Sequence, residues 1–530
     1  MPGVIAAGSE LTAAAGAAML QRGGNAVDAA VAAAFASFIA EIGVVHLGGS
    51  GIAQIFDPHT GRSVVYDFFS AMPGLGAPRP GRDLDFARVT IDFGATTQDF
   101  HLGRGSVAVP GNIAGLCRLA ADYGRLPLAT LLAPALTLAE QGATLDKFQA
   151  DTCELLRPLY VHTQSMRDIF TPQGQMLQAG DKVYIAHLAG TLRELASGGA
   201  ELIRSGRLAQ AIVADQQAHG GLLTATDLAA YEVGRLEPIR LPYRDYEILL
   251  PPPCSSGGVL TAFTLKLLAH FDFAGRPHGS AGHLQLLYEA MAATTRARPY
   301  WDRAAAEMPP AGAIAFFLDD AFLAPFVAEV REALHSRRPA LGVLEPPGPS
   351  NTSHLSVIDD EGLAVGLTTT AGESAGYVVP GTGFIPNNIL GEEDLNPHGF
   401  HNWPAGQRIP TMMTPTFVVH NGVIRLVVGS GGSVRIRSAV LQVLNNLLDY
   451  GLTLDQAVNA PRVHVENGVL QCEAGYDPAA VDRLEAWGYP VNRWPTRSIY
   501  FGGAHSVSRT VAGRLVPAGD NRRGGAVAQA

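Results

Sequence analysis

Cysteine is scarce in this chain of 530 residues. The four cysteines, Cys117, Cys153, Cys254 and Cys472, lie far apart, with no CxxC pair and no nearby histidine ladder. This spacing indicates neither a zinc site nor a disulfide framework, so we expect reduced thiols and no metal. The glycine-rich turn Gly48-Gly49-Ser50-Gly51 lacks the spacing of a nucleotide-binding loop, and we expect no cofactor.

Charge and long apolar runs are scarce too. Charged residues make up 16% and the formal net charge is −10, which argues against nucleic acid or an anionic membrane as a partner. The longest apolar run, Ala29 to Ala40, is too short to span a bilayer and predicts a buried helix. Met1 to Val4 has neither a charged n-region nor a hydrophobic h-region, so we predict no secretory signal and a cytoplasmic location.

Apolar side chains and arginine are abundant instead. Hydrophobic residues make up 47% of the chain, which is enough for a substantial core. Only Lys147, Lys182 and Lys266 are lysines, so arginine supplies 35 of the 38 basic residues. This usage is typical of a GC-rich genome.

Helical and strand patterns divide the chain near residue 352. Before it, a helical region from Ser9 to about Ala40 precedes a predicted hairpin of residues 52–56 and 63–68. The helical stretches that follow are predicted over 110–268, 281–295 and 313–334. After 352, strands are predicted over 354–358, 363–370, 417–419, 423–428, 499–502 and 506–515, with one helix over 436–450. Hairpins at both ends around helices predict an α+β fold with antiparallel sheets and helices outside.

A threonine stands at the point where this character changes. The Pro/Gly tract 345–350 cannot continue a helix or a central strand, and Asn351-Thr352-Ser353-His354 follows it. A threonine at a loop-to-strand junction suggests a masked nucleophile. Cleavage before Thr352 would free an α-amine that can act as base for the threonine's own hydroxyl.

Several motifs, in order along the chain, resemble the γ-glutamyltransferase family of N-terminal-nucleophile hydrolases. They are GGNAVDAA at 23–30, VPGNIAG at 109–115, PPCSSGG at 252–258, Thr352-Ser353-His354, VPGTG at 379–383 with Asn387-Asn388, and DNRRGG at 520–525. The resemblance implies a four-layer αββα sandwich, cleaved by itself between Asn351 and Thr352. A large subunit, 1–351, and a small subunit, 352–530, would share one intertwined domain.

The same resemblance assigns the remaining catalytic roles. Thr370 matches a second threonine that positions the nucleophile, although a packing role for it stays open. Gly431-Gly432-Ser433 lies where the family places its oxyanion hole, with the donors on Gly432 and Ser433. A glycine-rich turn entering a helix presents backbone N–H groups and a positive dipole end, which fits that role, although an ordinary turn stays possible.

The substrate-binding positions depart from the family pattern. Phe69 stands where family members carry an arginine for the substrate carboxylate, and a phenyl ring cannot pair with a carboxylate. Gly372 replaces an asparagine, the expected acidic residue falls at Glu392 or Glu393, and Thr411-Met412 replaces a serine pair. An apolar pocket is predicted at this place, with five candidate side chains: Phe68, Phe69, Met72, Met412 and Met413.

The segment Gly391 to Pro410 is a candidate lid, because connections of that length are uncommon and often functional. Its histidines, His398 and His401, are candidates for acid–base groups or metal ligands, although lone loop histidines usually are neither.

We therefore predict a self-cleaving Thr-nucleophile hydrolase acting on a small molecule other than an ordinary γ-glutamyl peptide. Three alternatives stay open: hydrolysis of a C–C bond in an alkenyl-proline antibiotic precursor, true γ-glutamyl transfer, and an inactive scaffold. A homodimer is possible.

Overall fold

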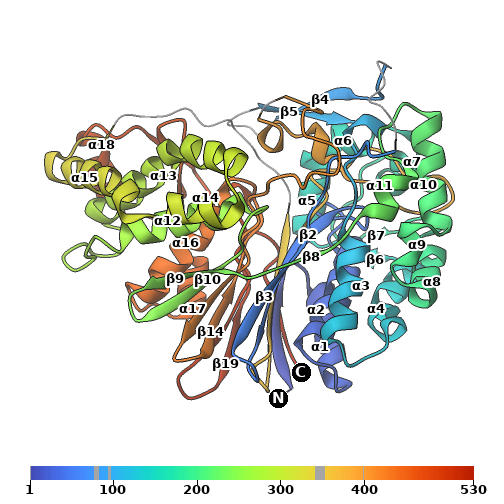
Figure 1. Cartoon of the computed structure of the whole chain (residues 1–530), viewed down its shortest axis with the longest axis horizontal. Coiled ribbons are helices and arrows are strands. Elements are labelled where there is room, and N and C mark those ends of the chain that lie inside the picture. The colour runs from blue at the N-terminus through green and yellow to red at the C-terminus, as the bar shows by residue number, and fades with distance from the viewer. Residues whose placement is uncertain (1, 77–82, 93–96, 341–351, 398) are drawn as a thin grey trace.

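Two antiparallel sheets packed face to face form the centre of the molecule. The computed structural model describes residues 2–76, 83–92, 97–340, 352–397 and 399–530 (Figure 1). The first sheet has the order β20 (Ala526–Gln529), β1 (Gly3–Ala7), β11 (Ser353–Asp359), β12 (Ala364–Thr370), β2 (Ser50–Asp57), β3 (Arg62–Phe68) and β8 (Gly234–Leu236). The second has the order β19 (Leu515–Ala518), β18 (Ser506–Arg509), β14 (Val423–Val428), β13 (Thr416–His420), β10 (Tyr246–Leu250) and β9 (Ile239–Tyr243).

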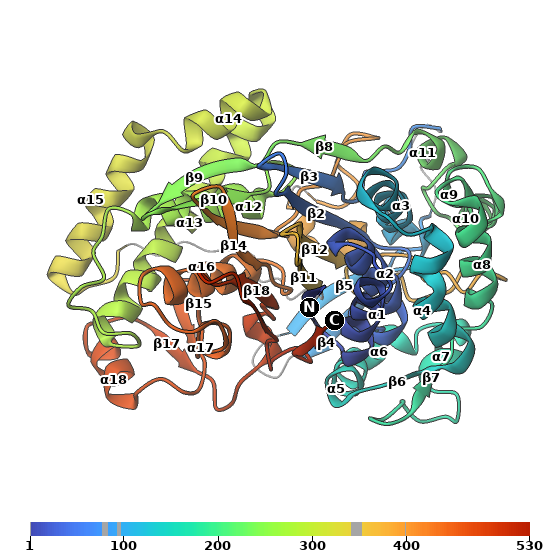
Figure 2. The same ribbon diagram turned by 90° about the horizontal axis from the view of Figure 1, so that it is seen from below.

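Helices cover the outer face of each sheet (Figures 1 and 2). On the first sheet lie α1 (Glu10–Gln21), α2 (Ala26–Ala40), α3 (Asn112–Tyr123) and α4 (Leu128–Gln141). On the second lie α12 (Ser256–Leu268), α13 (Ala281–Glu307) and α16 (Arg435–Leu448). A third apolar cluster, which includes Phe56, Leu249, Ile358 and Val427, fills the space between the sheets. The predicted four-layer αββα sandwich is confirmed.

The remaining elements extend these layers. The other helices are α5 (Lys147–Leu155), α6 (Arg157–Tyr160), α7 (Gln164–Phe170), α8 (Leu188–Gly198), α9 (Glu201–Arg204), α10 (Arg207–Ala218), α11 (Ala225–Ala230), α14 (Pro310–Phe317), α15 (Asp320–Ser336), α17 (Leu454–Asn459) and α18 (Pro478–Ala486). Short strand groups are β4 (Ala87–Asp92) with β5 (Thr97–Leu102), β6 (Ala143–Thr144) with β7 (Lys182–Val183), and β15 (Val463–Glu466), β16 (Val469–Cys472) and β17 (Val491–Arg493). Single 3₁₀ turns are η1 (Arg104–Ser106), η2 (Ile389–Gly391), η3 (Glu393–Leu395) and η4 (Ile499–Phe501).

The predicted buried helix is α2. Asn25 caps its N-terminus, where its side chain accepts from the N–H groups of Val27 and Asp28 while the Asp28 carboxylate accepts from the N–H of Asn25. All residues of the helix are buried, because small alanine side chains let α1 and α4 approach closely on either side. The helix ends at Glu41, a buried carboxyl that the apolar run delivers to the end of β11.

Both sheets combine strands from the two sides of residue 352. Strands β11 and β12 lie at the centre of the first sheet, between β1 and β2, which come from the N-terminal part. In the second sheet, β9 and β10 come from the N-terminal part and the other four strands follow residue 352. Cleavage before Thr352 stays a prediction, and the two resulting chains would each contribute strands to both sheets.

The structure corrects two strand predictions and adds strands that were not predicted. Residues 499–502 form η4 and not a strand, while 506–515 contains the separate strands β18 and the start of β19, joined by a turn. Strands β1, β9 and β10 were predicted as helical or left unassigned. Their residues are too few to show a period of two clearly, and pairing with β11 and β13 stabilises them.

One helical stretch among the described residues, Pro310–Ser336, is long and apolar enough to cross a membrane by length and composition alone. It is divided at Leu318 and Asp319 into α14 and α15, which both pack on α13. Neither helix reaches the roughly 20 residues that span a bilayer.

Candidate active site

Thr352 lies directly before β11 and is 2% exposed. In the β11–β12 ladder Ser353 pairs with Thr369, so extending the register by one step places Thr352 opposite Thr370. Thr370 is the last residue of β12, and its hydroxyl accepts from the N–H of Gly372 at 3.0 Å. The predicted nucleophile and the predicted second threonine therefore share one end of the central strand pair.

Alternation along β11 tells which way these side chains point. Ser353 faces α2, where its hydroxyl donates to Glu41 at 2.6 Å. His354 faces the second sheet, where its ring contacts the position that a Cβ on Gly429 would occupy. Successive residues of a strand point to opposite faces, so Thr352 faces the second sheet with His354. His354 bonds the hydroxyls of Thr368 and Ser356, and burial holds its pKa well below the usual range, so this histidine is neutral.

The glycine-rich turn 429–433 packs against the backbone of Thr352. A Cβ on Gly431 would lie 1.9 Å from the Thr352 carbonyl oxygen, so only glycine fits there. Gly432 and Ser433 follow with φ of 118° and 50°, and α16 begins at Arg435. A non-glycine residue with positive φ is uncommon and often marks a functional turn. The turn and the positive end of α16 therefore lie beside Thr352, as the oxyanion-hole prediction requires.

Ser433 also has a partner that the sequence did not indicate. Its hydroxyl donates a short hydrogen bond to Asp394, in η3 of the candidate lid. Burial raises the pKa of this carboxyl, while the hydrogen bond from Ser433 and the nearby Arg435 lower it. The predicted oxyanion turn is thus tied to segment 391–410 through one buried contact.

Glu392 occupies the space beside Gly372. Gly372 has φ of 67°, and a Cβ on it would lie 2.2 Å from Glu392 Oε1 and 2.3 Å from Asn388 Oδ1. Asn388 in turn accepts from the N–H of Glu373 at 2.7 Å. The space that an asparagine side chain at 372 would need therefore holds a buried carboxylate. Its neighbour Glu393 is exposed, so only the first of the two acidic candidates lies in the site.

Phe69 and Met412 belong to one apolar cluster with Met72, Ile389 and Leu390. Phe69 is fully buried, and its proposed correspondence to a substrate-binding arginine stays a prediction. These side chains are part of the buried core next to the site, and an apolar substrate pocket formed by them stays a prediction.

The prediction for Phe68 was wrong. It belongs to the other core and packs on Gly115, because neighbouring residues of extended backbone point to opposite faces.

Thr411 is held by main-chain contacts. Its N–H donates to the Cys254 carbonyl at 3.0 Å, and its own carbonyl accepts from Gly257. Ser255 donates to the carbonyl of Met413 at 2.7 Å. The motif at 252–258 therefore positions the 411–413 segment that lines the apolar cluster.

The candidate lid is packed against the β4–β5 hairpin and the end of β3. His401 Nε2 lies 2.8 Å from the Gly105 carbonyl, and Phe400 packs on His101 with ring centroids 4.5 Å apart. The N–H of Ile409 donates to the Ser70 carbonyl. His398 lies outside the described residues. Across the described ranges, no group of three or more His, Cys, Asp or Glu side chains could hold a metal ion.

Glu41 was not predicted as a site residue, yet its carboxyl lies one residue from the proposed nucleophile. It is 1% exposed and accepts from Thr12 at 2.7 Å in addition to Ser353. Burial raises its pKa to about 7, which the two hydrogen bonds oppose. Its position after the apolar run was the only sequence signal for a buried carboxyl.

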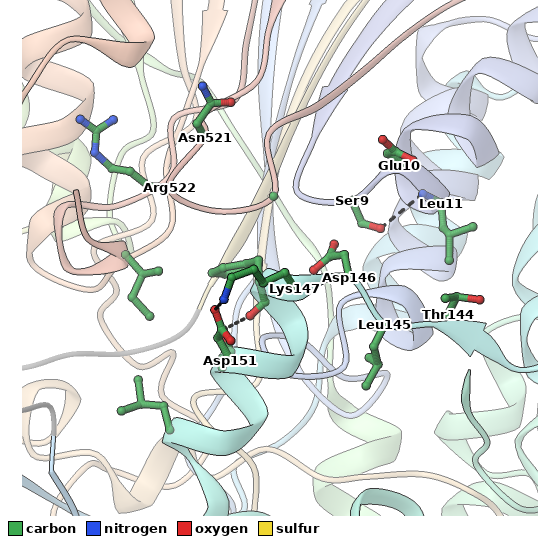
Figure 3. Close-up of a pocket in the computed structure, with 15 residues that line it drawn as sticks. Ser9, Glu10, Leu11, Thr144, Leu145, Asp146, Lys147, Asp151, Asn521 and Arg522 are labelled. Carbon is green, nitrogen blue, oxygen red and sulfur yellow. Dashed lines mark hydrogen bonds and ion pairs between the residues drawn. The ribbon is translucent and has the colours of Figure 1, made fainter. Parts of the chain in front are cut away.

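An open cavity of about 850 Å³ lies beside these residues, between α1, α5 and the C-terminal turn (Figure 3). Ser9, Asp146 and Lys147 line it together with Ile499 and Gly524. None of the predicted site residues is part of this lining. Gly524 packs on the Gly8 carbonyl, and Gly8 in turn leaves room for the Glu41 carboxyl.

Comparisons with known proteins identify the family and agree with the fold. The family model described as gamma-glutamyltranspeptidase matches residues 12–530. An "Acylase ACY 1 proenzyme" of Pseudomonas sp. (strain V22) is 33% identical, with 97% of this chain and 91% of that protein covered. A "Glutathione hydrolase proenzyme" of Escherichia coli (strain K12) is 31% identical, with 89% and 83% covered. The crystal structure of cephalosporin acylase from Bacillus halodurans superimposes with a TM-score of 0.85 at 25% identity, covering 99% of this chain and 95% of that one.

Fold and relatives together define an enzyme of the N-terminal-nucleophile hydrolase class. The chain belongs to the γ-glutamyltranspeptidase family.

Proposed function

We propose that this protein is a self-cleaving acyl hydrolase that uses Thr352 as its nucleophile and acts on a substrate other than an ordinary γ-glutamyl peptide. The observation that carries the proposal is the convergence of Thr352, Thr370 and the 431–433 turn at one buried strand end. The two relatives named as acylases, at 33% and 34% identity, support acyl-group chemistry.

Turnover begins when Thr352 Oγ attacks the substrate carbonyl and its proton passes to the α-amine of the same residue. Backbone N–H groups of Gly432 and Ser433 stabilise the oxyanion of the tetrahedral intermediate. The intermediate collapses, the α-ammonium returns the proton to the leaving group, and an ester remains on Thr352. Water then attacks the ester carbonyl and gives one proton to the amine, and as the ester C–O bond breaks the ammonium returns that proton to Thr352 Oγ, which releases the acid and restores the free amine and hydroxyl.

Maturation uses the same hydroxyl. Thr352 Oγ attacks the carbonyl of Asn351, the peptide bond breaks, and an ester joins the two residues while the α-amine is released. Hydrolysis of that ester leaves fragments of 351 and 179 residues from the chain of 530. The relatives named as proenzymes support such a step.

Specificity is inferred from the apolar cluster around Phe69. A substrate carboxylate would meet a buried phenyl ring there, while the Glu392 carboxylate fills the space beside Gly372. An acyl group without a free carboxylate at that end suits this surface, because an unpaired buried charge is costly.

Intact-mass analysis tests the nucleophile. The purified protein should convert from a 55.7 kDa chain into two fragments, the smaller beginning at Thr352. Thr352→Ala should remain uncut and inactive, while Thr352→Ser, which keeps a hydroxyl, should still be cut. An uncut wild-type chain after long incubation would favour the inactive scaffold.

A panel of 4-nitroanilides tests the specificity. We expect hydrolysis of aliphatic and phenylacetyl anilides and little hydrolysis of the γ-glutamyl anilide, with or without glycylglycine as acceptor. Robust γ-glutamyl turnover would establish the transferase alternative. Processing without turnover of any anilide would direct the search to C–C bond substrates.

A further inference from the structure

Arg523, in the C-terminal DNRRGG motif, lies directly against the proposed nucleophile. Its Nη1 donates to the Thr352 carbonyl at 3.2 Å, and its Nη2 donates to the Ile499 carbonyl at 3.2 Å. The side chain is 4% exposed, and its stem fills the space where Gly503 lacks a Cβ. The guanidinium is therefore held in place on both sides.

The neighbouring buried arginines differ from Arg523 in their partners. Arg522 pairs with Glu473 and Asp520, and Arg462 pairs with Asp520 at 2.6 Å. Arg523 bonds only carbonyl oxygens within the part of the chain that the structure describes. Its charge is thus not cancelled by a carboxylate at hydrogen-bond distance, and in a buried site such a charge acts strongly on its surroundings.

We propose that Arg523 is a positioning residue whose buried positive charge keeps the α-amine of Thr352 neutral near neutral pH, and so able to act as the base. This inference rests on the proposed function. The carbonyl that Arg523 contacts at 3.2 Å and the amine belong to the same residue, so the guanidinium lies within about 8 Å of the amine nitrogen. A nearby positive charge disfavours the protonated amine.

Other charged groups face Arg523 and the Thr352 amine, and they determine how far the pKa of the amine is lowered. Around Arg523 these are Glu373 after β12, Asp520 in the C-terminal turn, Arg435 at the start of α16 and Arg462 before β15, with the neutral His505 beside it. On the opposite side, Glu41 reaches the segment through Ser353, and Asp146 lies behind Glu41. On the side of Thr370 and the 431–433 turn lie the buried carboxyls of Glu392 and Asp394. Carboxylates favour the protonated amine, so Glu41, Glu373, Glu392 and Asp394 in their charged forms oppose Arg523.

Direct titration of the amine tests the proposal without any substrate. The mature wild-type protein is acetylated briefly with acetic anhydride from pH 5 to 9, and mass spectrometry measures modification of the peptide that begins at Thr352. We expect a midpoint below the ordinary range of about 7.7–8.0 for an α-amine. A wild-type midpoint within or above that range would overturn the proposal.

Two variants separate charge from packing. Arg523→Gln keeps hydrogen-bond donors without the charge and should raise the midpoint by about one pH unit, while Arg523→Lys should keep it near the wild-type value. The acidic limb of kcat/KM for a hydrolysed anilide should move in parallel. Equal midpoints in wild type and Arg523→Gln would show a purely structural role.

Glu373→Gln covers the case in which the Arg523 variants do not mature. It removes a carboxylate near Arg523 and should lower the midpoint, and an unchanged or raised midpoint would contradict the proposal. Failure of the proposed function gives a different result, because the wild-type protein would then yield no fragment beginning at Thr352.

Discussion

The hydroxyl of Ser353 donates a 2.6 Å hydrogen bond to Glu41, which joins the residue after the proposed nucleophile to the end of the most buried helix. The contact requires a glycine at position 8, since a Cβ there would lie 2.5 Å from Glu41 Oε2. A titratable carboxyl is thus fixed behind the β11 strand end, on the face opposite to that of Thr352.

Glu41→Gln should change how stability depends on pH. Burial raises the pKa of Glu41 from 4.5 to about 7 in the folded protein, so the folded state binds one more proton than the unfolded state between these values. The wild-type free energy of unfolding should therefore fall by roughly 3 kcal/mol from pH 4.5 to pH 7, and glutamine removes this loss. Urea unfolding of the wild-type protein and of Glu41→Gln at pH 5 and pH 8 measures this change in the free energy of unfolding. An equal change in both proteins would refute the raised pKa of Glu41.

Thr370→Val should lower kcat by about 10- to 100-fold, because the proposed nucleophile loses the hydroxyl that positions it. The matched control is Thr369→Val. Thr369 is equally buried, but it pairs with Ser353 and points to the opposite face of β12. Steady-state kinetics on one anilide compare kcat of the two variants. An equal loss of kcat in both would mean that the Thr370 hydroxyl serves packing alone.

Gly431→Ala should block maturation. The added Cβ would lie 1.9 Å from the Thr352 carbonyl oxygen, and moving the strand end apart costs about 1–3 kcal/mol or more. Gly312→Ala, in α14 with open space around it, should mature normally. Gel electrophoresis over time compares the two, and normal cleavage of the Gly431→Ala chain would show that the turn does not bear on Thr352.

Ser433→Gly distinguishes the backbone from the side chain as oxyanion donor. Glycine keeps the N–H and suits the φ of 50°, so kcat should fall less than about tenfold. If the Ser433 hydroxyl were the oxyanion donor, its removal would instead lower kcat by about 10²- to 10³-fold. The variant also removes the hydrogen bond to Asp394, so a thermal-unfolding scan should accompany the kinetics to measure the cost of that lost contact.

Local patterns predicted much of the central architecture. The strands predicted over 417–419 and 423–428 are β13 and β14 of one hairpin, and the helix predicted over 436–450 is α16. These elements depend on nearest-neighbour chemistry, such as positive φ at Asn421 and Gly422. By contrast, β1 is five residues long and exists because β11 and β20 pair with it from positions hundreds of residues away.

The site, too, combines residues that the sequence indicated with residues that only the packing reveals. Motif order placed Thr352, Thr370 and the glycine turn in one site, and the β11–β12 register and the Gly431 contact are those such a site needs. The neighbours Glu41, Asp394 and Arg523 carried no motif that revealed their partners. Each reaches the site from a different layer or turn, and only the packing of those layers brings them within hydrogen-bond distance.

By itself, the sequence determined the predicted strands on either side of the turn at 359–362, the hairpin 417–428 and the helix that follows it, because periodicity, turn residues and side-chain type act locally, while the order of its motifs indicated the family and with it the four layers. Only the tertiary structure decided which charges lie buried around Thr352 and which phenylalanine faces the site. The reason is that electrostatics and burial depend on distances through space, which the order of residues along the chain does not contain.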